Sequence, residues 1–153
     1  MRDVAYIALG SNLGDRAGYL TRARAAMQRL PDSRIVAASE VEETPPFGPP
    51  DQPPYLNQMV ALETTLDPES LMAELLRIEQ AEGRVRGVKW GPRTLDLDIV
   101  SYEEQTHSGP TVTVPHPELT NRDFWLRQLA AVRQLPSSVR NHGSHGRPRK
   151  ATE

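Results

Sequence analysis

The stretch from Arg84 to Ile99 reads Arg-Val-Arg-Gly-Val-Lys-Trp-Gly-Pro-Arg-Thr-Leu-Asp-Leu-Asp-Ile. Its second half alternates as a β-strand does, with apolar side chains on one face and Asp96 and Asp98 on the other. Successive residues on one face of a strand lie roughly 6.5 to 7 Å apart. The sequence therefore predicts two carboxylates held side by side on one face of a strand.

The first half of this stretch is cationic, and its two glycines and one proline favour a loop over a helix. Its charged and aromatic residues are Arg84, Arg86, Lys89, Trp90 and Arg93. Neighbouring carboxylates repel each other unless a cation lies between them. A hard divalent cation such as Mg²⁺ binds carboxylate oxygens and bridges to phosphates, so the stretch predicts a magnesium and polyphosphate site. The alternative is a half-exposed strand whose wet face carries two aspartates with no ligand.

Length and composition narrow the function classes. A chain of 153 residues suits one domain with its own core, and we expect a domain over residues 1–136 and a disordered basic tail over 137–153. A net charge of −2 argues against a general nucleic-acid binder, and the lack of cysteine excludes disulfides and thiolate metal sites. The apolar run at 4–9 is too short for a signal peptide or a membrane span. We expect a cytoplasmic monomer with no membrane or nucleic-acid partner.

Hydrophobic periodicity and turn residues predict an α+β fold. Strands are expected at 4–9, 35–41, 56–66, 94–102 and 111–114, and helices at 16–30, 68–82 and 122–135. Asp67 is the expected N-cap of the second helix and Gly83 its C-terminal cap. The last helix is expected to bury Phe124, Leu126, Leu129 and Val132. The order strand, helix, strand, strand, helix, strand, followed by a short strand and a helix, predicts a ferredoxin-like antiparallel sheet packed with helices.

A proline-rich segment interrupts this pattern at 44–55. It holds six of the fourteen prolines and also carries Phe47 and Tyr55. Proline stiffens the chain and blocks both helix and ladder pairing. A linker is one interpretation, but a stiff loop with aromatic residues inside a compact domain is more typical of a binding loop.

These features together favour phosphoryl-type transfer to a flat heterocycle. His116 and Arg122 join the basic loop as groups able to bind phosphates, and Phe47, Tyr55, Trp90 and Phe124 could hold a flat ring. Such transfer requires in-line positioning and neutralisation of negative charge. Two alternatives remain open. One is a nucleic-acid-binding module that stacks bases on Trp90, and the other is a metal-dependent phosphohydrolase.

Residues 90–98, with 83–86 before them, closely resemble the signature of the 6-hydroxymethyl-7,8-dihydropterin pyrophosphokinase family. Segments 6–13, 44–48, 51–57, 114–116 and 121–124 are also similar to elements of that family. The resemblance implies transfer of a pyrophosphoryl group from ATP to the hydroxymethyl group of the pterin, with release of AMP, in folate biosynthesis. It also implies that Asp96 and Asp98 bind two Mg²⁺ ions.

The same resemblance implies roles for individual residues. Tyr55 and Phe124 would sandwich the pterin ring and Asn57 would bond its polar edge. Thr44, Pro45, Phe47 and Trp90 would complete the pterin pocket. The ATP contacts implied are Arg84, Arg86, Trp90, Arg93, Ile99, Thr113, His116 and Arg122. Arg84, Arg93, Asp96 and Asp98 are the implied catalytic residues, with Arg84 arriving on a loop that closes over ATP.

Overall fold

A computed structural model describes residues 2–45, 52–83 and 94–133. The strands are β1 (Asp3–Ser11), β2 (Arg34–Ala38), β3 (Glu42–Thr44), β4 (Tyr55–Thr64), β5 (Asp96–Tyr102), β6 (His107–Ser108) and β7 (Thr113–Val114). The helices are α1 (Arg16–Gln28), α2 (Pro68–Ala81) and α3 (Asp123–Val132), with a 3₁₀ turn at Leu119–Asn121 before α3. The predicted α+β class is confirmed, with three helices and an antiparallel sheet of five strands.

Three boundaries differ from the predictions. The strand expected at 35–41 is two strands, β2 and β3, which both pair with β4. The first strand, expected to end at residue 9, runs on through Gly10 to Ser11. His107 and Ser108, which lie outside the strands expected from the sequence, form β6 and pair with β7.

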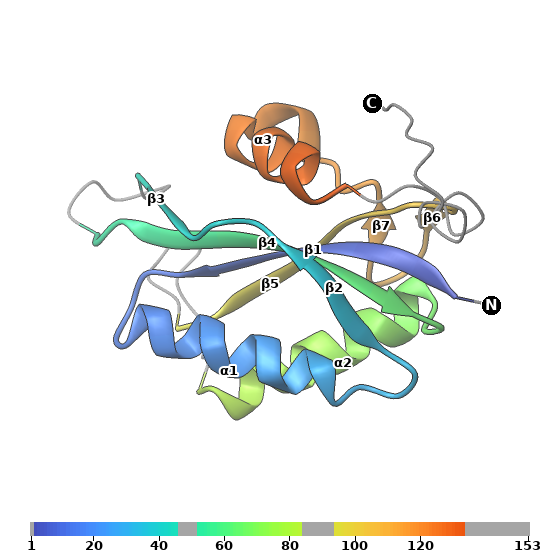
Figure 1. Cartoon of the computed structure of the whole chain (residues 1–153), viewed down its shortest axis with the longest axis horizontal. Helices are drawn as coiled ribbons and strands as arrows, with labels where there is room; N and C mark the ends of the chain where they lie inside the picture. The colour runs from blue at the N-terminus through green and yellow to red at the C-terminus, as the bar shows by residue number, and fades with distance from the viewer. Residues whose placement is uncertain (1, 46–51, 84–93, 134–153) are drawn as a thin grey trace, which may run out of the picture.

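The main sheet is antiparallel, in the order β2-β4-β1-β5. The short strand β3 pairs with the first residues of β4, on the same side of β4 as β2. Helices α1 and α2 cover one face and α3 covers the other (Figure 1). β1 is therefore central in both senses, since it has strands on either side and helices above and below. All nine of its residues are buried, as expected for a strand covered on both faces.

Two apolar clusters follow from this layering. Ile7, Leu9, Leu97 and Ile99 point toward α1 and α2, while Tyr6 and Ala8 point toward α3. A register shift between β1 and β5 opposite Tyr6 and Ile7 changes the alternation of β5. Asp96 and Asp98 precede this shift, so they share the α3 face with Ala8 rather than the α1 and α2 face.

Helix α2 begins and ends as the sequence predicts. The Asp67 carboxylate accepts a hydrogen bond from the Ser70 amide at 2.8 Å, and Pro68 follows it at the first helical position. Gly83 has a φ of +83°, the left-handed conformation that a helix-ending glycine adopts readily.

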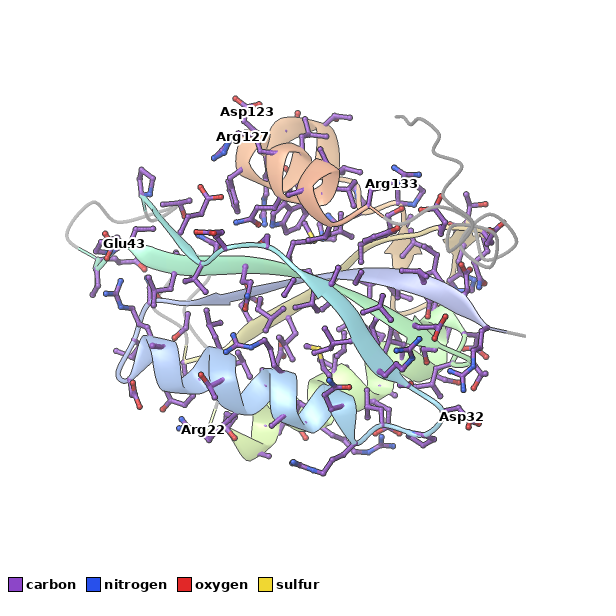
Figure 2. All side chains as sticks on the ribbon, viewed as in Figure 1. Arg22, Asp32, Glu43, Asp123, Arg127 and Arg133 are labelled. Carbon is purple, nitrogen blue, oxygen red and sulfur yellow. The ribbon has the colours of Figure 1, made fainter. Side chains whose placement is uncertain are left out.

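Helix α3 buries a different stripe from the one predicted. Leu126 is 41% exposed, whereas Trp125 is only 2% exposed and packs with Leu129 and Val132. Residues 125, 129 and 132 have the spacing of one face of a helix. Helix α3 turns this face toward the sheet, and Leu126 lies outside it. Figure 2 shows Asp123 on the side of α3 that points away from the sheet. None of the helices in the described ranges has the length and apolarity needed to cross a membrane.

Candidate active site

A pocket opens where α3 begins, over the sheet face formed by β1, β4 and β5, with β3 at its edge. Eleven residues line it: Ala8, Leu9, Gly10, Thr44, Tyr55, Asn57, Asp96, Asp98, Arg122, Phe124 and Trp125. They come from five elements and from the turn before α3. The structure thus brings together seven of the residues that the sequence predicts for the site, namely Thr44, Tyr55, Asn57, Asp96, Asp98, Arg122 and Phe124.

The acidic pair lies on β5, whose alternation puts both carboxylates on the pocket side and Leu97 in the core on the other side. β5 is an edge strand, so one row of its backbone groups has no neighbouring strand. Glu79 of α2 meets this edge, and its Oε2 accepts a hydrogen bond of 2.7 Å from the Leu97 amide. The residue between the two aspartates is therefore fixed to a helix by a carboxylate that is only 2% exposed.

The opposite wall is held by a polar contact between two strands. The Asn57 amide on β4 donates to the Thr44 hydroxyl on β3. Gly10 of β1 faces these residues, and a Cβ there would lie 3.3 Å from the Asn57 Oδ1 and 3.4 Å from the Tyr55 ring. The glycine therefore leaves room for the close approach of Tyr55 and Asn57.

A second set of contacts anchors the proline-rich segment where it enters β4. Asn12 is fully buried, and its amide donates to Gln52 Oε1 at 3.1 Å and to the Pro53 carbonyl at 3.3 Å. Arg16 donates to the Pro54 carbonyl at 2.8 Å and forms an ion pair with Glu43 at 3.2 Å. The end of β1 and the start of α1 thus fix the backbone that leads into Tyr55.

His116 faces Asp98 from the segment after β7. Its amide donates to the Val100 carbonyl at 2.8 Å, and its Nε2 lies 3.7 Å from Asp98 Oδ1. Its Nδ1 accepts a hydrogen bond of 3.0 Å from the Glu118 amide. The neutral ring therefore carries its hydrogen on Nε2, the side that faces Asp98.

The charge of His116 differs from the sequence interpretation, which grouped it with the cations. Burial lowers the pKa of His116, and the positive charge of Arg122 lowers this pKa further. The neutral imidazole is thus favoured at pH 7. In this state the ring can donate a hydrogen bond from Nε2 but carries no positive charge.

Arg122 and Phe124 flank the start of α3, and both contact the Trp125 ring. The Arg122 guanidinium carbon lies 4.3 Å from the centroid of the Trp125 ring. The Phe124 ring is 6.2 Å from the same indole in an edge-on arrangement. Ala8, Leu9, Gly10 and Trp125 are the pocket residues that the sequence analysis did not assign to the site. The helical spacing of Trp125 with Leu129 and Val132 is a signal in the sequence that could have identified Trp125 as a buried residue.

Other predicted site residues lie elsewhere. Pro45 lines a shallower hollow next to the pocket, together with Thr44, Asn121, Arg122 and Phe124. Thr113 is exposed on β7 and is not among the pocket residues. The Ile99 side chain is 1% exposed and packs under α1 and α2, so only its backbone could reach a nucleotide on the pocket side. Phe47, Arg84, Arg86, Trp90 and Arg93 lie outside the described residues, as do Lys89 and the expected tail.

The donor chemistry of the pocket fits magnesium. Within residues 2–45, 52–83 and 94–133, no group of three or more His, Asp or Glu side chains is placed to hold a metal ion. The pocket instead offers the two carboxylates of Asp96 and Asp98, on one face of β5. Mg²⁺ is commonly held by one or two carboxylates, several waters and phosphate oxygens of the substrate, so a pair without a third protein ligand is suited to it.

Comparison with known proteins identifies the family. The model of the 7,8-dihydro-6-hydroxymethylpterin-pyrophosphokinase family, abbreviated HPPK, matches residues 6–134. The chain belongs to the HPPK family. The match spans β1 to the end of α3 and so includes every element that lines the pocket.

Curated relatives agree with this assignment. A 2-amino-4-hydroxy-6-hydroxymethyldihydropteridine pyrophosphokinase of Pseudomonas aeruginosa is 46% identical over 125 residues, covering 82% of this chain and 77% of the relative. The protein of the same name from Haemophilus influenzae is 42% identical over 137 residues, with 88% and 86% coverage. The Folic acid synthesis protein fol1 of Schizosaccharomyces pombe is 36% identical over 129 residues, 84% of this chain and 18% of that longer protein.

Membership of the HPPK family makes this chain a pyrophosphokinase of folate biosynthesis. The two alternatives left open by the sequence, a nucleic-acid-binding module and a phosphohydrolase, are not favoured by these relatives. Family membership does not assign roles to individual residues of this chain.

Proposed function

We propose that this HPPK-family chain transfers the pyrophosphoryl group of ATP to the hydroxymethyl oxygen of 6-hydroxymethyl-7,8-dihydropterin, with AMP as the second product. One observation carries the proposal: a single pocket combines the acidic pair Asp96 and Asp98 with the aromatic and amide groups Tyr55, Phe124 and Asn57. A phosphohydrolase needs the first set but has no use for the second. A base-stacking module needs aromatic residues but not two neighbouring carboxylates.

The pterin would occupy the β3, β4 and α3 side of the pocket. Tyr55 and Phe124 present flat faces to a bicyclic ring, and stacking on such faces is favourable and geometrically selective. Asn57 is 7% exposed, and its amide nitrogen is engaged by Thr44. Its carbonyl oxygen can therefore accept from the donor-rich edge of the pterin. Thr44 and Pro45 close the edge near β3.

The triphosphate would lie between the acidic pair and the start of α3. Magnesium held by Asp96 and Asp98 would neutralise phosphate charge and polarise the phosphoryl group that is transferred. Arg122 would add a guanidinium whose planar set of N–H donors suits phosphate oxygens. His116 would donate from Nε2, the atom that already faces Asp98.

The bond changes follow from the products. The hydroxymethyl oxygen attacks the β-phosphorus of ATP, and the bond from that phosphorus to the oxygen bridging the α and β phosphates breaks. AMP departs with the bridging oxygen, and the hydroxyl proton is lost. The chain contributes by holding acceptor and donor in line and by excluding water. Arg84 and Arg93 are proposed to neutralise charge on the phosphates, as the family resemblance implies.

The test is the dependence of AMP release on the pterin. Purified protein is incubated with ATP and Mg²⁺, with and without 6-hydroxymethyl-7,8-dihydropterin, and AMP is quantified by chromatography. We expect AMP to form only when the pterin is present, in a one-to-one ratio with pyrophosphorylated pterin. Equal AMP or ADP formation without pterin would instead indicate a phosphohydrolase, and salt-sensitive binding of oligonucleotides without turnover would indicate the nucleic-acid-binding module.

A further inference from the structure

We infer that Trp125 is a positioning residue for the nucleotide, acting through Arg122 and His116 rather than by touching the reacting atoms. The inference rests on the proposed function, because it concerns which substrate these two side chains serve. Trp125 is the bulkiest of the buried residues of α3, and the sequence analysis did not assign it to the site.

The indole contacts both groups. The ring of His116 lies 4.9 Å from the Trp125 ring with an interplanar angle of 84°, an edge-on contact. The guanidinium of Arg122 lies 4.3 Å from the indole centroid, within the range of a cation–π contact. His116 and Arg122 come from segments on either side of the 3₁₀ turn, and Trp125 is where the two side chains meet.

The indole itself is buried in the core. It is 2% exposed and packs among Tyr6, Ala8 and Met59 on the α3 face of the sheet. The backbone amide of Trp125 donates to the Arg122 carbonyl at 3.0 Å, so both residues belong to the same helical turn. A buried ring fixed by the core can therefore act as a rigid support for groups that rest on it.

Both supported groups depend on such a support. An arginine side chain has many rotamers, and contact with a flat ring limits them before a ligand arrives. A cation–π contact uses the face of the guanidinium, while its N–H donors lie in the plane and remain geometrically suited to phosphate oxygens. The edge-on contact likewise limits rotation of the His116 ring, whose Nε2 must keep facing the acidic pair.

Replacement of Trp125 should thus affect the affinity for ATP more than the affinity for the pterin. Arg122 and His116 are the groups proposed for the phosphates, whereas the pterin is assigned mainly to Tyr55, Asn57 and Phe124.

We expect Trp125→Leu to raise KM for ATP about tenfold while KM for the pterin stays within about threefold of the wild-type value. Trp125→Phe keeps an aromatic face and should retain most of the ATP affinity. Leu126→Ala, at an exposed neighbour on the same helix, is the matched control and should change neither KM.

A double-mutant cycle separates positioning from a general loss of packing. If Trp125 acts through Arg122, then Arg122→Ala should raise KM for ATP much less in the Trp125→Leu background than in the wild type. Additive effects of the two changes, or equal increases of both KM values, would overturn the inference. Should Trp125→Leu unfold at the assay temperature, the same cycle is run with Trp125→Met, which keeps a large apolar side chain but removes the aromatic face.

Failure of the inference can be told apart from failure of the proposed function. The wild-type protein alone tests whether AMP release requires pterin. If that release is seen and the cycle is additive, only the role of Trp125 is wrong. Isothermal titration of each variant with a non-hydrolysable ATP analogue and Mg²⁺ gives the same comparison as a dissociation constant, without turnover.

Discussion

His116 Nε2 lies 3.7 Å from Asp98 Oδ1, and this contact joins the segment after β7 to the strand that carries the acidic pair. Because Nδ1 accepts from the Glu118 amide, the hydrogen on the neutral ring points at the carboxylate. The histidine therefore faces Asp98 and, while neutral, adds no positive charge of its own. Replacement of either carboxylate by an amide should remove one acidic group from this face of β5.

We predict that Asp96→Asn or Asp98→Asn lowers kcat by about 100-fold or more, the range seen when an electrostatic group of an active site is removed. Both side chains are only half-buried beside the pocket, so thermal stability should change little. Steady-state AMP release and thermal unfolding of the same samples check both parts.

The matched control is Asp32→Asn. Asp32 lies in the turn after α1, beside Arg2 at the opposite end of β1 from the pocket, and its φ of +47° is one that asparagine also adopts. This variant should keep wild-type turnover. Full activity in Asp96→Asn or Asp98→Asn would remove the metal-binding role assigned to the pair.

β5 and α3 differ in how well the sequence predicts which of their residues are buried. The alternation at 95–99 correctly predicted that Leu95, Leu97 and Ile99 are buried, because a strand has only two faces and a period of two. It also implied that Ile99 lies opposite the aspartates, yet the family resemblance placed Ile99 among the ATP contacts. In α3, several apolar residues could form the buried stripe, and only packing against Tyr6, Ala8 and Met59 selects Trp125 over Leu126.

Glu79 shows a limit of another kind. Its position four residues after Leu75 places it at the border of the buried face of α2. Its bond to the Leu97 amide could not be predicted, because helical periodicity says which face is buried but not which strand edge it meets. Sheet order supplies that information, and sheet order comes from contacts between residues distant in sequence.

We predict that Glu79→Ala destabilises the protein by about 1 to 3 kcal/mol, the typical cost of leaving a buried polar group unsatisfied. The Leu97 amide on the edge of β5 would lose the acceptor that the carboxylate provides at 2.7 Å. Turnover should also fall, because Leu97 lies between the two aspartates. Urea unfolding at 25 °C and kcat measured on the same samples test both effects.

Glu79→Gln is the comparison, since its amide oxygen can still accept from the Leu97 amide. It should lose less stability than Glu79→Ala. If both variants are as stable as the wild type, the contact does not contribute to holding β5.

A pH dependence is expected at the start of α2. Hydrogen bonds from Ser70 lower the pKa of Asp67, and hydrogen bonds from Thr111 and then His107 lower the pKa of Glu69. A carboxyl whose pKa is lower in the folded state stabilises the fold fully above its unfolded pKa of about 4. This stabilisation is lost as the pH falls through the folded-state pKa.

We therefore predict that Asp67→Asn makes the free energy of unfolding less sensitive to acid. Asparagine keeps an N-cap oxygen for the Ser70 amide but cannot be protonated in this range. Between pH 6 and pH 2.5 the wild type should lose more stability than Asp67→Asn in urea unfolding. Asp67→Ala should cost about 1 kcal/mol at pH 6, the usual value for a lost N-cap. Parallel pH curves for the wild type and Asp67→Asn would contradict the assignment.

Tyr55 provides a test that separates the two substrates. It begins β4, where the bonds from Asn12 and Arg16 fix the preceding segment, and its ring lines the pocket near Gly10. Loss of one stacking face costs about 1 to 3 kcal/mol for bases on aromatic residues, which corresponds to roughly 10- to 100-fold in affinity. We predict that Tyr55→Ala weakens pterin binding by this factor and leaves the affinity for an ATP analogue within about threefold.

Tyr55→Phe is the control for this comparison, because it retains the ring and removes only the hydroxyl. It should bind the pterin much more tightly than Tyr55→Ala. Titration calorimetry of each variant with the pterin and with a non-hydrolysable ATP analogue measures both affinities. Equal losses for the two ligands in Tyr55→Ala would mean that the ring supports the pocket as a whole, since a stacking partner affects only the ligand that lies against it.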